Sequence, residues 1–97
     1  MPDTQEWTFA DHNPEDELAR LEFFSIKKLQ DGKAIEFRIT VREFNKRNQL
    51  SMRFYAEADK QTNQKTAPFT PMGWGETLLG ALVECIRAIK RFPYEGE

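Results

Sequence analysis

Basic and aromatic side chains in the middle of the chain are the residues whose types and spacing could do chemistry. Arginines occupy polar positions of two alternating stretches, 34–42 and 50–58, and Tyr55 lies among them. Proteins hold single-stranded nucleic acid by stacking aromatic rings on bases while cations contact phosphates. We therefore expect a surface that binds single-stranded DNA or RNA, formed by Phe23, Arg38, Arg42, Lys46, Arg47, Arg53 and Tyr55.

The same residues have two other interpretations. In one, the surface is an ordinary solvated face, on which acids and bases pair with one another and Arg38 lies against the ring of Tyr55 as a cation–π contact. In the other, it is a protein interface, because Phe23 and Tyr55 are costly to leave in water. The apolar residues Phe23, Tyr55, Val83 and Phe92 would leave an exposed patch, so we expect a homodimer. An adaptor or an antitoxin-like domain would also fit this second interpretation, and the sequence leaves all three interpretations open.

Catalytic and metal-binding groups are sparse. His12 lies in a polar leader and Cys85 on the apolar side of an expected helix, so we do not expect a Cys-His pair. Most of the clustered carboxylates also lie in the leader, where no cleft could raise their pKa values. One His and one Cys exclude a zinc-finger site. We expect a non-catalytic protein that needs no metal and no cofactor.

The segment Gly73-Trp74-Gly75 precedes the expected helix. Glycines at a helix N-terminus can cradle a phosphate on free backbone amides. However, this segment lacks both the third glycine of a dinucleotide fingerprint and the lysine of a P-loop. We expect the glycines to let the chain turn and Trp74 to pack as a core or rim anchor. Gly80, within the helix, costs ~1 kcal/mol relative to Ala, which a close approach to the sheet or to a partner helix would offset.

Strict alternation of apolar and polar residues predicts the strands that position these side chains. Stretches 34–42 and 50–58 each place apolar residues on one face, which is typical of half-buried strands. A four-residue turn over 45–48 predicts a register with Ile39 opposite Phe54 and Val41 opposite Met52. A one-residue slip would turn the second strand's apolar side chains outward.

A further strand is predicted over 23–29, joined to the next by a tight turn at Asp31-Gly32. This turn places Ile26 opposite Phe37 and Phe24 opposite Ile39. A fourth, edge strand is expected over 64–69, where Pro68 allows only an edge position.

Helical periodicity predicts a helix over 76–91 that covers the apolar face of the sheet, with Glu76 in its first turn and Lys90 and Arg91 in its last. Pro93 ends it. A short helix near 14–20 is also expected after Asn13. The predicted fold class is α+β: a three- to four-stranded antiparallel meander packed on one face by a C-terminal helix.

Charge divides the chain into an acidic leader and a basic body. Residues 1–22 carry seven acids and one base, a balance of -6, and residues 23–97 carry nine acids and thirteen bases, a balance of +4. We expect residues 1–13 to be a flexible leader and residues 14–97 a single domain. If the body binds polyanions, the leader can compete for the basic face, and deleting residues 1–13 should tighten binding most at low salt.

Length and cysteine content bound the class of protein. Ninety-seven residues suffice for one domain. No apolar run reaches the ~18 residues of a membrane span, and the N-terminus lacks the features of a signal peptide. A lone cysteine excludes an internal disulfide framework, so a cytoplasmic protein is expected.

Two stretches resemble known families. Strands rich in basic residues followed by a C-terminal helix, with the stretch Thr40-Val-Arg-Glu-Phe44, resemble the Whirly and transcriptional-coactivator family of dimeric single-strand binders. The stretch from Gly75 to Ile89 is similar to the helix of HicB-type antitoxins. This chain lacks the antitoxins' glycine- and proline-rich strand before that helix, and their appended DNA-binding segment. Neither resemblance covers the chain with a specific motif, so the sequence assigns no family.

Overall fold

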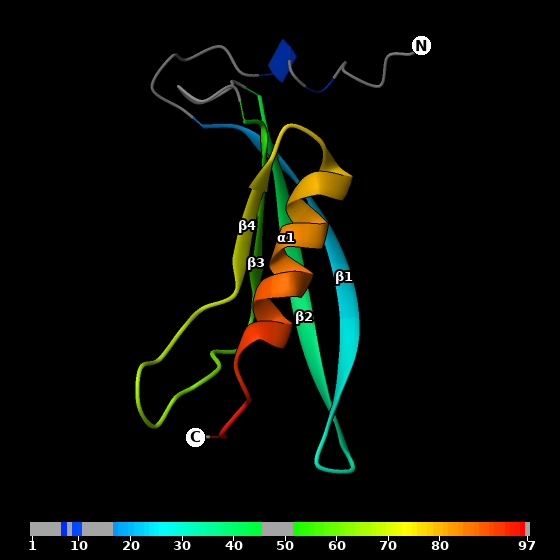
Figure 1. Ribbon diagram of the computed structural model, residues 1–97. Helices are drawn as coiled ribbons and strands as arrows, with labels where there is room; N and C mark the ends of the chain where they lie inside the picture. Colours follow the sequence, from blue (N-terminus) through cyan, green and yellow to red (C-terminus); the bar gives the residue numbers. More distant parts are fainter. Residues whose placement is uncertain (1–6, 8, 11–16, 46–51, 97) are drawn as a thin grey trace.

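The computed structural model describes residues 7, 9–10, 17–45 and 52–96. Four antiparallel strands form one sheet in the order β1-β2-β3-β4, and a single helix, α1, packs on one face of it (Figure 1). This confirms the predicted α+β class. The face under α1 is called the inner face below, and the opposite face is called the outer face.

Strands β1 (Ala19–Gln30) and β2 (Lys33–Phe44) form a long hairpin. Its two turn residues, Asp31 and Gly32, both have positive φ (54° and 79°), as a type I′ turn requires. Phe24 lies opposite Ile39 and Ile26 opposite Phe37, so the predicted register of this pair is confirmed.

The prediction of a short helix near 14–20 is wrong for its last two residues. Ala19 and Arg20 belong to β1, where they pair with Phe44 and Glu43. The alternation of the hairpin extends β1 back to these residues, and pairing along the full length of β2 outweighs a local helical preference. Residues 14–16 of the expected helix lie outside the described part of the chain.

The predicted register between the second and third strands is also wrong. Ile39 lies opposite Ala58, and Phe54 lies opposite Glu43. Strand β2 continues to Phe44, and β3 (Phe54–Ala58) begins only at Phe54, so the connection is longer than the expected four-residue turn. The shift is four residues, which is even, so the apolar side chains still face inward.

The fourth strand, β4 (Met72–Gly75), lies further along the chain than the predicted edge strand over 64–69. In that earlier segment the structure has an isolated bridge between Thr62 and Phe69. Gly73 and Gly75 face α1 at very short distance: a Cβ on either would lie 2.5 Å from a backbone atom of Ala81. The glycines therefore permit close packing of strand and helix, where a turn was expected.

Helix α1 (Leu78–Arg91) begins after Thr77, whose side-chain hydroxyl accepts a hydrogen bond from the Gly80 amide at 3.0 Å. Glu76 therefore precedes the first turn, in which it was expected, because Thr77 is the better N-cap. Lys90 and Arg91 occupy the last turn as predicted. Gly80 packs against β4, since its added Cβ would lie 3.9 Å from the Cα of Gly75.

The core lies between α1 and the inner face. It consists of Phe37, Ile39, Val41, Ala56, Ala58, Ala81, Cys85 and Ile89, all buried. The helix packs mainly against β4, and less against β3 and β2. Over the described residues, no helix has the length and apolar character required to cross a membrane.

The C-terminal segment is tied to β1 by side chains from the hairpin. The Lys28 amine donates to the carbonyls of Ile89 (2.9 Å) and Phe92 (2.6 Å), which lie at the C-terminal end of α1. Gln30 both donates to the Tyr94 carbonyl and accepts from its amide. A cation at the negative end of a helix is favourable, so these contacts fix the end of α1 against β1.

Candidate functional site

Two rows of side chains cross the outer face, one residue from each strand. The register aligns Leu21, Arg42, Tyr55 and Trp74 in one row and Phe23, Thr40, Glu57 and Met72 in the next. All eight residues alternate with core or helix-facing positions of their strands, so they project away from α1. The outer face is therefore a continuous surface with apolar, aromatic and charged side chains.

Three aromatic rings, one each from β2, β3 and β4, gather on this face. The rings of Tyr55 and Trp74 lie 4.6 Å apart between centroids, and those of Phe44 and Trp74 stack 6.2 Å apart at 21°. Trp74 remains 43% exposed. We call Phe44, Tyr55 and Trp74 the aromatic platform, because Trp74 packs against both of the other rings and keeps part of its own ring toward solvent.

Charged neighbours surround the hydroxyl end of Tyr55. Burial raises the pKa of Tyr55, and the Glu57 carboxylate raises it further, whereas Arg42 lowers it. Arg42 is the strand partner of Tyr55 on β2. The Tyr55 hydroxyl also lies 3.7 Å from the Met72 sulfur, to which it donates. The platform thus has a cation, Arg42, and an acid, Glu57, within electrostatic reach.

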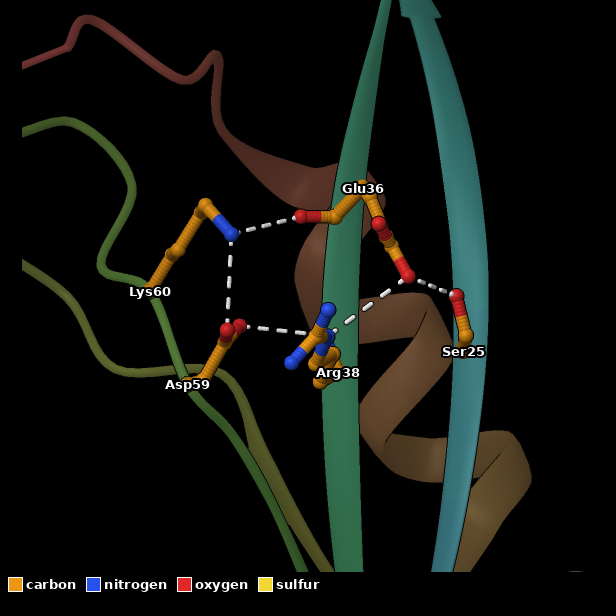
Figure 2. A network of polar contacts seen from close by, with 5 residues as sticks. All are labelled: Ser25, Glu36, Arg38, Asp59 and Lys60. Carbon is orange, nitrogen blue, oxygen red and sulfur yellow. Dashed lines mark hydrogen bonds and ion pairs between the residues drawn. The ribbon is translucent and has the colours of Figure 1, made fainter.

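A network of five polar residues lies further along the outer face, toward the hairpin turn (Figure 2). Ser25 donates to the Glu36 carboxylate at 2.7 Å, and the Arg38 guanidinium lies 3.7 Å from that carboxylate. On the other side, the backbone amide of Arg38 donates to Asp59 at 3.0 Å. Lys60 donates to the Glu36 carbonyl at 2.8 Å and lies 3.4 Å from Asp59.

The network fixes the position of β2 relative to its neighbours and leaves the Arg38 side chain mostly free. That side chain is 75% exposed, and its contact with Glu36 is long. The Ser25 hydroxyl, more than any other group, holds the pKa of Glu36 below its ordinary value, and Arg38, Lys27 and Lys60 act in the same direction. Arg38 can therefore bind an anion from solvent without losing a close ion pair.

The structure brings four of the seven predicted site residues to the outer face. Arg38 and Arg42 lie on β2, Tyr55 on β3, and Phe23, which is 71% exposed, on β1. Their predicted neighbours change with the corrected register: Tyr55 lies opposite Arg42, whereas it was expected opposite Arg38.

Arg53, expected on the same face, forms an ion pair with Glu43 instead. Its guanidinium lies 3.1 Å from the Glu43 carboxylate and donates to the Phe44 carbonyl at 3.2 Å. Both side chains of this ion pair are largely buried, 20% and 14% exposed. Arg53 therefore has a structural partner and is a poor ligand for phosphate. Lys46 and Arg47 lie outside the described residues.

Sequence reasoning missed Phe44 and Trp74. Trp74 was expected to pack as a core or rim anchor, because its flanking residues Gly73 and Gly75 are typical of turns. The alternation Met-Gly-Trp-Gly contained the missed signal: if the glycines face a helix, then Met72 and Trp74 face the other way. Phe44 was left out because the strand was predicted to end at Arg42, two residues too early.

The described residues offer little for covalent or metal chemistry. Cys85 is completely buried, and burial raises the pKa of its thiol to about 11, so it is protonated and inaccessible at neutral pH. No group of three or more His, Cys, Asp or Glu side chains among the described residues could hold a metal ion. The outer face carries the exposed ring of Trp74 and the exposed guanidinium of Arg38.

None of the family models, curated proteins and solved structures compared with this chain matches it. The two resemblances noted from the sequence stay predictions.

Proposed function

We propose that this protein is a non-catalytic module that binds single-stranded nucleic acid across the outer face of its sheet. One observation carries the proposal: Trp74 is 43% exposed, contacts the ring of Tyr55, and lies in the same cross-strand row as Arg42. Adjacent aromatic rings and a cation on an open sheet are the elements with which single-strand binders stack bases and neutralise phosphates.

In this proposal the aromatic platform receives bases and the arginines of β2 contact the backbone. Arg38 and Arg42 are four residues apart on one face of one strand, which corresponds to about 13 Å. They would therefore contact different phosphates of an extended strand. Phe23, on the neighbouring β1, offers a further exposed ring for a base beyond the platform.

A second candidate function is a protein-interaction surface on the same face. Its supporting observation is the exposure of apolar side chains on β1, where Leu21 is 47% and Phe23 71% exposed. Salt concentration distinguishes the two functions. Phosphate contacts release counterions, so nucleic-acid affinity falls steeply as salt rises, whereas an apolar protein interface responds weakly.

The test is a fluorescence-anisotropy titration of labelled single-stranded DNA and RNA at low salt, with the native protein and Trp74→Ala. Losing one stacked base costs ~1–3 kcal/mol, so affinity should fall by about 5- to 150-fold. Leu79→Ala is the matched control, because Leu79 is 68% exposed but lies on α1, on the opposite side of the sheet. It should bind like the native protein.

A second pair of variants tests the phosphate contact. Arg42→Ala and Lys90→Ala each remove one positive charge, but Lys90 is in the last turn of α1. Only Arg42→Ala should reduce the salt dependence of binding, by about 0.7 in the slope of log affinity against log salt. Absence of binding at tens of micromolar protein, or equal losses in Trp74→Ala and Leu79→Ala, would refute the proposal.

A further inference from the structure

Strand β1 is a long edge strand. It has 12 residues and, among the described strands, pairs only with β2 (Figure 1). The Asn45 amide donates a hydrogen bond to the carbonyl of Leu18, the residue directly before β1. Even-numbered residues at this end of the hairpin therefore direct their backbone polar groups toward β2. Alternation then directs the N–H and C=O groups of odd-numbered residues 19–29 to the open edge.

This edge is protected only in part. Edge strands are usually kept short or protected by charged residues, prolines or bulges; β1 carries Arg20, Lys27 and Lys28, but it is long and regular and contains no proline. Three of the seven exposed large hydrophobic residues of the described chain lie on it: Leu21 (47%), Phe23 (71%) and Leu29 (80%). Helix α1 packs mainly on β4 and β3, and its C-terminal end contacts β1 through Lys28.

We propose that β1 pairs antiparallel with β1 of a second copy of this chain, with Ser25 opposite Ser25 on the twofold axis. In this register the exposed apolar residues and several charged residues of β1 meet suitable partners. Leu21 lies opposite Leu29 and Phe23 opposite Lys27 on the outer face. On the inner face Phe24 lies opposite Ile26, and Glu22 lies opposite Lys28, whose amine also bonds the end of α1. The pattern of the strand is therefore complementary to itself, in both apolar and charged residues.

The neighbouring registers are worse. Moving the axis by one residue to Phe24 places Arg20 opposite Lys28, a like-charge pair, and Glu22 opposite the apolar Ile26. Moving it to Ile26 places Phe24 opposite Lys28 and Leu21 opposite Asp31. Only the axis at Ser25 pairs both exposed leucines with each other, so the sequence of β1 selects one register.

The resulting dimer has one continuous eight-stranded sheet. Directly opposed residues share a face, so both copies of α1 lie on one side and both outer faces on the other. The two copies of Phe23 come close to the twofold axis, and the two aromatic platforms lie far from it. This inference depends on the edge and its register and does not rest on nucleic-acid binding.

A cysteine at the axis tests the register. Ser25→Cys places two thiols on directly opposed residues, whose Cα atoms are ~5.5 Å apart in such a pair, within the range of a disulfide. Mild oxidation should convert most of this variant to a covalent dimer. Lys27→Cys is the matched control, because its thiols would be about four residues, or ~13 Å, apart along the strands. The buried Cys85 should leave the native protein uncross-linked.

Oligomeric state provides the second test. Light scattering on the native protein should give twice 11.4 kDa. Leu29→Lys removes two Leu21–Leu29 contacts per dimer and should raise the dissociation constant roughly tenfold, whereas Leu79→Lys on α1 should not. A mass of 11.4 kDa up to hundreds of micromolar overturns the proposal. So does a dimer in which Lys27→Cys cross-links as readily as Ser25→Cys.

Discussion

Replacing Gly73 by alanine tests the packing of α1 on β4 more directly than any other single change. An added Cβ would lie 2.5 Å from the Ala81 carbonyl oxygen, 2.7 Å from the Cys85 amide nitrogen and 2.7 Å from the Glu84 Cβ. The first two are backbone atoms within α1, so no side chain can rotate away. The helix itself must move from β4 by close to 1 Å to restore an ordinary contact distance.

That movement loosens the core beneath the helix. A radial gap of 0.5–1 Å forfeits about a quarter to a half of the dispersion energy of each contact, and overpacking usually costs ~1–3 kcal/mol. Because backbone atoms are displaced, we expect the upper end, about 3 kcal/mol. A domain of this size is stabilised by roughly 5–15 kcal/mol, so the midpoint of thermal unfolding should fall by about 12–24 °C.

Gly80→Ala is the matched control, because it adds the same methyl group to the facing helix. Its nearest neighbour would be the Thr77 hydroxyl at 3.3 Å, which can shift by a few tenths of an ångström, and the Gly75 Cα is at 3.9 Å. Helix propensity favours alanine by ~1 kcal/mol, so this variant should be as stable as the native protein or more so. Urea unfolding followed by circular dichroism measures both. A Gly73→Ala variant with native stability would refute the described packing.

Two further predictions concern ionisable groups. Burial raises the Cys85 pKa from 9.0 to about 11, so the folded state favours the protonated thiol. This contribution to the free energy of unfolding, ~3 kcal/mol, is complete below pH 9 and is lost as pH rises toward 11. In urea unfolding across this range, the free energy of unfolding should fall more steeply with pH for the native protein than for Cys85→Ala. Equal slopes for the two proteins would contradict the prediction. Ser25→Ala should raise the pKa of Glu36 toward its ordinary value, because the Ser25 hydroxyl is the largest cause of its depression. A carboxyl NMR titration measures this, and Lys27→Ala should move the pKa less; the opposite ranking would contradict the assignment.

Strands β1 and β2 and helix α1 could be predicted because their patterns are local. The alternation of β1 and β2, with a turn residue pair that favours positive φ, determines both the hairpin and its register. The register of β3 could not be predicted in the same way. Apolar alternation excludes slips by one residue, but a slip by four keeps Phe54 and Ala56 on the inner face. Only the length of the connection between β2 and β3 distinguishes the two registers, and the alternation of apolar and polar residues does not depend on that length.

The candidate site was predictable in part for the same reason. Arg42, Tyr55 and Phe23 were placed on the correct face because a face depends only on parity. Their neighbours depend on register, so the contact of Tyr55 with Trp74 and the burial of Arg53 against Glu43 did not follow from the pattern. Trp74 was missed because its flanking glycines serve a tertiary contact with α1, and local turn preferences do not report tertiary contacts.

The hydrogen bonds between β1 and the C-terminal segment join parts of the chain that the ribosome makes at different times. Gln30 binds the backbone of Tyr94, 64 residues later. At a synthesis rate of ~5–20 residues per second, Tyr94 is made about 3–13 seconds after Gln30. A hairpin forms within about 1–10 microseconds. Throughout synthesis of the intervening chain, the apolar side of β2 therefore lacks Cys85 and Ile89, which complete the core. During those seconds the apolar side of the nascent β1–β2 hairpin has no helix packed on it, and its exposure ends only once α1 has been made.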